Sequence, residues 1–416
     1  MDTKKIIFII QSRIGNALDI SFDLITTQSD SALVLIAQQE VIEEVNRRKW
    51  TGYFKAILPV SPSFSFAEVS TSIEQYLSEL ESFKNNLTFE IVTINESKVD
   101  LCGKLKVHFG LQSQDLSHFV YKDKMKSFAQ AQKINTPNFT VIDKNEAKKN
   151  LSQYSEKIIK HIGLPCFIKP VNMFASKHCH KINSKDQLEN RLKVLVDDSL
   201  TYQAESFIDG NLYLCDTIVT RGQVRFLQVC EYSSPCVKIY DNPSLGWITL
   251  PRSDALNQKI EQFAYQVNNA FLPDESGVTH LEIFEKSGEL SFLEIAYRSN
   301  GIEPSNFYLK RANIPLREMH FLTQINPDIP INIEESNYVA CFLINYPQKA
   351  GKLKKIAKLP IQSEFSIRWN CDIGESLPSN QGYDAYAGTI IIWNQSYKTL
   401  RDDFEKMKSF EPLIID

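Results

Sequence analysis

Short apolar runs separated by helix-like stretches open the chain. Runs of strand length lie at residues 6–10, 32–36, 56–60 and 89–94. Between them, residues 38–48 and 66–80 carry apolar positions at helical spacing. Apolar strands that alternate with helices are typical of a parallel sheet with crossover helices. We therefore predict an α/β domain over residues 1–119.

The pattern changes after residue 119. Asp123 can cap a helix that runs to about Asn135, where Thr136-Pro137 stops it. A helix is also expected over residues 254–271. Further strands are predicted at residues 139–142, 166–170, 202–207, 213–220, 223–231, 278–284 and 290–296. This order indicates an α+β domain over residues 120–331.

A last segment, residues 332–416, has strands near 338–344 and 389–393 and a helix over 396–407. We predict a small α+β subdomain that packs on the preceding domain. The expected fold class is therefore α/β followed by α+β, in three parts.

Charge and composition narrow the choice of partners. The 416 residues include 46 Lys and Arg against 50 Asp and Glu, a formal charge of -4. Such a balance gives no field that favours nucleic acid or an anionic membrane surface. The first apolar run is too short for a signal peptide, no segment is long enough to span a bilayer, and the eight cysteines form no C-x-x-C pair. We expect a cytoplasmic protein that binds neither nucleic acid nor membranes.

The first strand lacks the usual dinucleotide-binding turn. Residues 12–16, Ser-Arg-Ile-Gly-Asn, supply one glycine where that turn needs three. A Rossmann-type oxidoreductase is one alternative for this chain, and the missing glycines argue against it.

Charged residues at the ends of apolar strands are the candidates for chemistry. Lys169 ends the run Cys166-Phe167-Ile168, where an ammonium needs an anionic partner. Glu282 and Glu294 lie in two strands joined by the turn-like Lys286-Ser287-Gly288-Glu289, so a hairpin would bring both carboxylates together. Adjacent buried carboxylates repel unless a divalent cation such as Mg²⁺ lies between them.

These pieces, in this order, resemble the ATP-grasp superfamily over nearly the whole chain. Its members include biotin carboxylase, the purine-synthesis ligases and the L-amino acid ligases, in which a Rossmann-like domain precedes a two-lobed ATP-grasp fold. The Asp-Lys pair at 123–124 and Gly163-Leu164-Pro165-Cys166-Phe167-Ile168-Lys169 look like the two phosphate-binding motifs, which implicates Lys124 and Lys169. Glu205-Ser206-Phe207-Ile208 resembles the adenine hinge, where Glu205 and the backbone would meet the ring.

The resemblance also implies a metal site. Thr279-His280-Leu281-Glu282 and Leu293-Glu294-Ile295-Ala296-Tyr297-Arg298 match the metal-binding strands. Glu282 and Glu294 would then hold Mg²⁺ or Mn²⁺, and Arg298 would stabilise the transferring phosphate.

Two motifs depart from the family pattern. The flap after Lys169 lacks the usual glycines, so only Ser176 keeps a phosphate-contacting role. The backbone N–H groups of the flap can still cradle phosphate if the turn avoids positive φ. The ribose-binding glutamate is replaced by Leu212, which leaves Asp216 or Asp209 as candidates.

The implied activity is carboxylate–amine ligation that consumes ATP through an acyl phosphate. Catalysis would use Arg298 and Lys169, under a lid of about residues 164–207. The partners are then ATP, a carboxylate and an amine, such as amino acids, with a homodimer as a candidate assembly. Glu231, Lys238, Asn300 and Gly301 are candidate substrate residues. The alternative is a weakened relative that binds nucleotide as a regulatory module.

Overall fold

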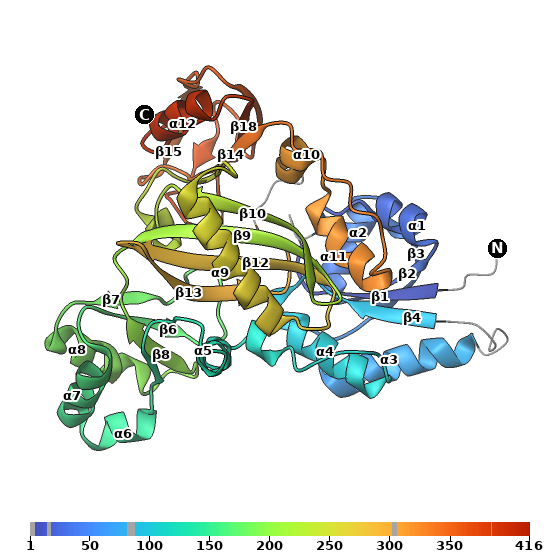
Figure 1. Ribbon diagram of the computed structural model, residues 1–416, viewed down its shortest axis with the longest axis horizontal. Helices are drawn as coiled ribbons and strands as arrows, with labels where there is room; N and C mark the ends of the chain where they lie inside the picture. The colour runs from blue at the N-terminus through green and yellow to red at the C-terminus, as the bar shows by residue number, and fades with distance from the viewer. Residues whose placement is uncertain (1–4, 15–17, 81–87, 302–305, 384) are drawn as a thin grey trace.

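Three arms surround a central sheet in the computed structural model, which describes residues 5–14, 18–80, 88–301, 306–383 and 385–416 (Figure 1). The N-terminal arm is a parallel sheet of order β3-β2-β1-β4. Its strands are β1 (Lys5–Gln11), β2 (Ala32–Ala37), β3 (Phe54–Pro59) and β4 (Thr88–Val92). Its helices are α1 (Phe22–Ser29), α2 (Gln39–Arg47), α3 (Phe66–Glu79) and α4 (Val99–His108), with short 3₁₀ turns η2 (Thr51–Tyr53), η4 (Glu96–Lys98) and η5 (Ser117–Phe119). The predicted α/β fold is confirmed.

The second arm is a small antiparallel sheet of order β5-β8-β6-β7. Its strands are β5 (Phe139–Val141), β6 (Cys166–Pro170), β7 (His180–Ile182) and β8 (Tyr202–Ser206), and its helices are α6 (Lys144–Lys149), α7 (Leu151–Ile162) and α8 (Lys185–Leu195). Ile168 and Ala204 pack in an apolar cluster with residues of α7 and α8. Because side chains alternate along a strand, Lys169 and Glu205 point to the opposite face.

The central sheet has eight strands in the order β13-β12-β9-β10-β11-β14-β18-β16. They are β9 (Asn211–Thr220), β10 (Gln223–Tyr232), β11 (Ser244–Thr249), β12 (Gly277–Lys286), β13 (Glu289–Ala296), β14 (Tyr338–Ile344), β16 (Glu364–Trp369) and β18 (Gly388–Asn394). The strands after residue 331 thus continue the same sheet. The boundaries proposed at 119/120 and 331/332 remain predictions.

The remaining elements cover this sheet and form the third arm. The helices are α5 (Lys122–Ala131), α9 (Ala255–Phe271), α10 (Phe307–Ala312), α11 (Leu316–Ile325), α12 (Tyr397–Met407) and the 3₁₀ helix η6 (Cys236–Tyr240). A separate sheet of order β17-β15-β19 is made by β15 (Gly351–Ile356), β17 (Ser376–Leu377) and β19 (Leu413–Ile415).

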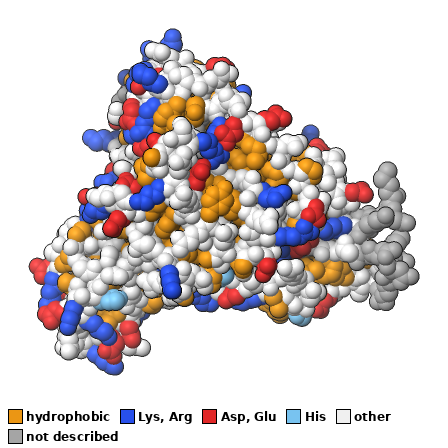
Figure 2. All heavy atoms as spheres, in the orientation of Figure 1, with side chains coloured by type: hydrophobic (Ala, Val, Ile, Leu, Met, Phe, Trp, Pro, Cys, Tyr) orange, Lys and Arg blue, Asp and Glu red, His pale blue; other side chains and the backbone are white. Residues whose placement is uncertain are grey.

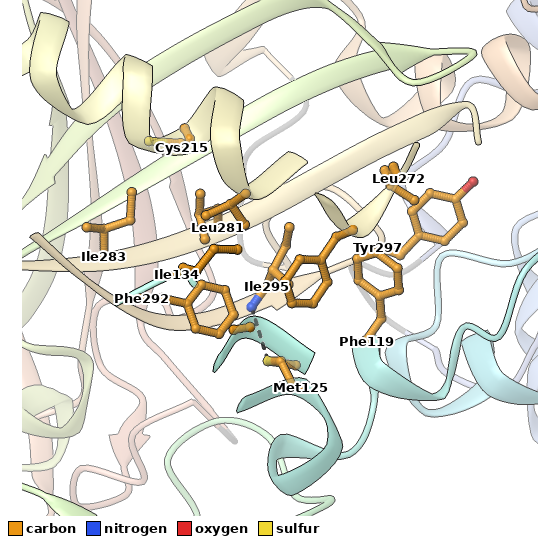
Figure 3. Packing of buried hydrophobic residues seen from close by; sticks show 14 of the residues in the cluster. Phe119, Met125, Ile134, Cys215, Leu272, Leu281, Ile283, Phe292, Ile295 and Tyr297 are labelled. Carbon is orange, nitrogen blue, oxygen red and sulfur yellow. Dashed lines mark hydrogen bonds between the residues drawn. The ribbon is translucent and has the colours of Figure 1, made fainter. Parts of the chain in front are cut away.

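Helix α5 is held firmly against the hairpin of β12 and β13. Met125 lies beneath this hairpin in an apolar cluster with Phe292 and Ile295, and its Sδ accepts the Ile295 N–H at 3.4 Å (Figure 3). The helix begins one residue before Asp123 and is preceded by Tyr121, so the prediction that Asp123 caps it is wrong. This start fixes which residues of α5 face the hairpin.

The surface carries charges of both signs. On the face in Figure 2, Lys and Arg are interspersed with Asp and Glu over all three arms. Within the described residues, none of the helices has the length and apolar character needed to cross a membrane.

Candidate functional site

The predicted hairpin of two glutamates is present. Glu282 and Glu294 are cross-strand partners in the antiparallel pair β12 and β13. Leu281 and Ile283 enter the apolar cluster behind the sheet, so by alternation Glu282 faces the other way, where it is 8% exposed. Paired residues in such a ladder have Cβ atoms about 5 Å apart. Two carboxylates at this spacing form an oxygen-rich site suited to a hard divalent cation.

Glu282 is held in place by buried neighbours. Its Oε1 accepts a hydrogen bond of 3.0 Å from the Tyr232 hydroxyl on β10 and a longer one of 3.6 Å from the Cys236 thiol. Donors on one oxygen orient a carboxylate and leave its other oxygen for a metal ion.

A lysine–glutamate cluster lies opposite this face. Lys169 contacts Glu205 Oε1 at 2.8 Å, and Lys126 contacts Glu205 Oε2 at 3.2 Å. Burial alone would raise the pKa of Glu205, but the two ammonium groups lower it below its ordinary value. Burial also lowers the pKa of Lys126 to about 8, against the opposing effect of Glu205. The anionic partner expected for Lys169 is therefore Glu205.

Lys122 joins the cluster to the hairpin. Its Nζ lies 3.4 Å from Glu294 Oε2 and donates to the Met173 carbonyl at 3.0 Å. Burial would raise the pKa of Glu294, but Lys122 and then Lys169 lower it to about 2. Lys122 and Lys126 were not among the predicted site residues, although their spacing of four places both on one helix face.

Lys124 does not join this cluster, contrary to expectation. It is exposed, and its Nζ donates to the Ser117 hydroxyl at 3.2 Å. Two residues along a helix correspond to a rotation of about 200°, so Lys124 points away from the face that carries Lys122 and Lys126.

Arg298 connects the hairpin to the N-terminal arm. Its Nε donates to Glu96 Oε2 at 2.9 Å, its Nη2 contacts the same oxygen, and its Nη1 donates to the Ser299 carbonyl at 2.8 Å. Burial would lower the pKa of Arg298, but Glu96, with further contributions from Glu294 and Asp216, raises it. Glu96 lies 202 residues away in sequence, and nothing local to either residue indicated this pair.

The hinge segment has the expected position, but the side chain of Glu205 does not point along it. Both Glu205 oxygens are engaged by lysines, so an adenine amino group would have to displace one of them. The Ser206 N–H donates to the Asn138 carbonyl at 2.9 Å, and the Phe207 N–H donates to the Pro165 carbonyl at 3.2 Å. The next backbone N–H is that of Ile208, the one expected to meet the ring.

Asp216 is not placed to bind ribose. It is 1% exposed, and its two oxygens contact His280 Nδ1 and the Tyr308 hydroxyl, each at 2.7 Å. Burial would lower the pKa of His280, but Asp216 and Glu282 raise it to about 10. Asp216 thus belongs to the buried polar network beneath Glu282, which corrects the expectation. Asp209, the other candidate, is exposed beyond the hinge.

Two of the four candidate substrate residues lie elsewhere. Glu231 forms a bidentate pair with Arg401 of α12, at 2.6 and 3.0 Å, because it alternates with Tyr232 and faces the opposite side of the sheet. Lys238 is exposed, 3.9 Å from Asp241. Asn300 and Gly301 lie two and three residues after Arg298, and Asn300 is buried. Residues 302–305 of the same segment lie outside the described residues.

The flap, defined here as residues 171–178, adopts left-handed backbone without glycine. The φ angles are 60° at Ala175, 53° at Ser176 and 57° at His178, so the condition set for phosphate binding by a turn without glycine is not met. The Tyr240 hydroxyl donates to the Ala175 carbonyl at 3.1 Å. Side chains in this region of φ are strained by about 1–2 kcal/mol per residue.

Comparisons with known proteins find ligases among the chains that resemble this one. A family model described as the D-ala D-ala ligase C-terminus matches residues 128–295. The L-arginine-specific L-amino acid ligase of Bacillus subtilis is 26% identical over 292 residues, covering 67% of this chain and 68% of that protein. An L-amino acid ligase structure from Bacillus licheniformis has a TM-score of 0.72 and 15% identity, over 100% of this chain and 98% of that one.

A further structure is the biotin carboxylase domain dimer of the Hydrogenobacter thermophilus 2-oxoglutarate carboxylase. It was solved with MgADP, ADP and bicarbonate. It has a TM-score of 0.64 and 11% identity, over 99% of this chain and 90% of that one.

Lysines of a small lobe approach paired glutamates of a large antiparallel sheet in this chain. The chain is similar to the ATP-grasp ligases of the carboxylate–amine type, as its motifs indicated. ATP and Mg²⁺ are the cofactors of this class, and the described residues fit both: the buried Glu282 and the partly exposed Glu294 for the cation, and ammonium groups for the phosphates.

Proposed function

We propose that the protein joins a carboxylate to an amine through an acyl phosphate, with amino acids as substrates. The observation that carries this proposal is the register of Glu282 with Glu294, with Lys122 3.4 Å from Glu294 and Lys169 near enough for Glu294 to affect its pKa. Such a site suits a phosphate chain and its cation. The choice of amino acids is supported by the named activity of the L-arginine-specific relative.

The reaction has two steps. A carboxylate oxygen of the first substrate attacks the γ-phosphorus of ATP, and ADP leaves. The amine of the second substrate then attacks the acyl carbon, loses a proton, and releases phosphate. Mg²⁺, when bound, would withdraw charge from the β- and γ-phosphates and orient them for the first step.

The chain's own residues hold and screen the reacting groups. Glu282 and Glu294 would bind the cation, and Lys169 would contact the phosphates after parting from Glu205. Arg298, held by Glu96 beside Glu294, would stabilise charge on the transferring phosphate. The lid of about residues 164–207 would close over the nucleotide and keep water from the acyl phosphate.

A screen for phosphate and ADP release tests this proposal. Purified protein with MgATP is given single amino acids, pairs of amino acids, dipeptides and small carboxylates, and products are read by mass spectrometry. We expect ADP release that depends on a carboxylate and an amine together, and at least about a hundredfold loss in Glu294→Gln. Tight ATP binding without turnover on any pair would instead support the regulatory-module alternative. Activity that survives Glu294→Gln would refute the metal assignment.

A further inference from the structure

Lys122 is fixed to the flap by three contacts. Its backbone N–H donates to the Val171 carbonyl at 2.8 Å, and its Nζ donates to the Met173 carbonyl at 3.0 Å. The same Nζ lies 5.6 Å from the centre of the Phe174 ring. A single residue of α5 therefore contacts three of the first four flap residues.

The same ammonium group lies against the hairpin. Lys122 Nζ is 3.4 Å from Glu294 Oε2, and its side chain is 8% exposed. Glu294 is one of the two carboxylates proposed to bind Mg²⁺. A divalent cation about 2.1 Å from the carboxylate oxygens and an ammonium 3.4 Å away would repel, and water reaches the pair only from the side of Glu294, whose side chain is 34% exposed. The ammonium therefore competes with the metal ion for Glu294.

We propose that Lys122 is the resident counter-cation of Glu294, which Mg²⁺ displaces and which then turns with the flap to the nucleotide phosphates. This inference rests on the proposed function. A lysine suits such an exchange because its ammonium is a compact charge on a flexible stem and can change partner from carboxylate to phosphate. Since Lys122 is attached to the flap, its movement would couple the loading of the cation to flap closure.

The exchange predicts opposite effects of Lys122 on the affinity for the cation alone and on the affinity for ATP. Without nucleotide, the cation must displace an ammonium whose one ion-pair partner among the described residues is Glu294, so the cation binds weakly. With ATP present, the ammonium gains the phosphates as partners, so cation and nucleotide bind together. Removing the ammonium should therefore strengthen binding of the cation alone and weaken binding of ATP.

Lys122→Met tests this pair of effects, because methionine keeps most of the apolar stem. Mn²⁺ serves as the probe, with its free fraction measured by electron paramagnetic resonance, and ATP binding is measured by calorimetry with Mg²⁺. In Lys122→Met we expect Mn²⁺ without nucleotide to bind at least about tenfold more tightly and ATP at least about tenfold more weakly. Lys122→Gln, which still donates to the Met173 carbonyl, should show the same gain in Mn²⁺ affinity and thus guards against a local folding defect.

Lys104→Met is the matched control. It removes one exposed ammonium, which pairs with Asp100 at 2.7 Å away from the site, and should change neither affinity by more than about twofold. A fall in both affinities at Lys122 would mean that the residue only supports the fold, and unchanged Mn²⁺ affinity would also overturn the inference. The unmodified protein should bind MgATP and Mn²⁺, and Glu294→Gln should abolish this binding. If the unmodified protein shows no such binding, the proposed function fails, and the inference fails with it.

Discussion

Glu205 is the residue whose removal should most disturb the lysine–glutamate cluster. It is 4% exposed and is the shared anionic partner of Lys126 and Lys169, at 3.2 and 2.8 Å. In Glu205→Gln, both ammonium groups stay buried without that partner. Removing one member of a buried ion pair costs about 3–5 kcal/mol.

Deprotonation of Lys126 accounts for part of this loss. The pKa of Lys126 is already about 8 with Glu205 present, so without it Lys126 should lose its proton at pH 7. A fully neutral lysine at pH 7 costs roughly 4.6 kcal/mol against an ordinary pKa of about 10.4, and a pKa of about 8 already costs roughly 3.2 kcal/mol, so Lys126 contributes about 1.4 kcal/mol.

Urea unfolding at pH 7, followed by circular dichroism, measures the loss. Glu146→Gln is the control, because Glu146 pairs with Lys149 at 2.9 Å on the surface, and its loss should stay within about 0.5 kcal/mol. A loss below about 1 kcal/mol for Glu205→Gln would show that water reaches the cluster, and would refute the reasoning.

Two further predictions concern the core and the flap. Burial lowers the pKa of His320 to about 4. In the core, neutral His320 accepts a hydrogen bond from the Val278 N–H and donates one to the Thr93 carbonyl. The unfolded chain then binds the proton more tightly, so the free energy of unfolding should fall by up to roughly 3 kcal/mol as pH falls from about 6.5 to 4. Unfolding curves of His320→Gln should lack this loss. Equal dependence of stability on pH in the two proteins would contradict the prediction. Ala175→Gly should leave the melting temperature unchanged or raise it, because glycine tolerates φ of 60°. The control Ala147→Gly, in helix α6, should lower the melting temperature, because it costs about 1 kcal/mol of stability. Equal losses in the two variants would show that the flap is not strained.

The residues of the hairpin could be predicted because the information is local. Alternation along β12 separates His280 and Glu282 from Leu281 and Ile283, and the turn joins the two glutamate strands as a hairpin. A register shift between Glu282 and Ile283, which has no signal in the sequence, places Glu294 directly opposite Glu282. Lys169 could likewise be predicted, since it ends an apolar strand.

Contacts between distant segments could not be predicted in the same way. The choice between Lys122 and Lys124 depends on how α5 is rotated, and that rotation is set by the packing of Met125 under β13. The link from Glu96 to Arg298 joins two arms of the fold. The sharing of one sheet by β11 and β14 depends on pairing across the whole chain and has no signal in either strand alone.

The transfer of oxygen from substrate to phosphate tests the central claim most directly. The protein is given MgATP, an amine and a carboxylate substrate identified in the screen and labelled with ¹⁸O, and the released phosphate is examined by ³¹P nuclear magnetic resonance. An acyl phosphate leaves one substrate oxygen on the phosphate, so we predict one ¹⁸O in each phosphate released with product. Product formed with unlabelled phosphate would contradict the proposed mechanism.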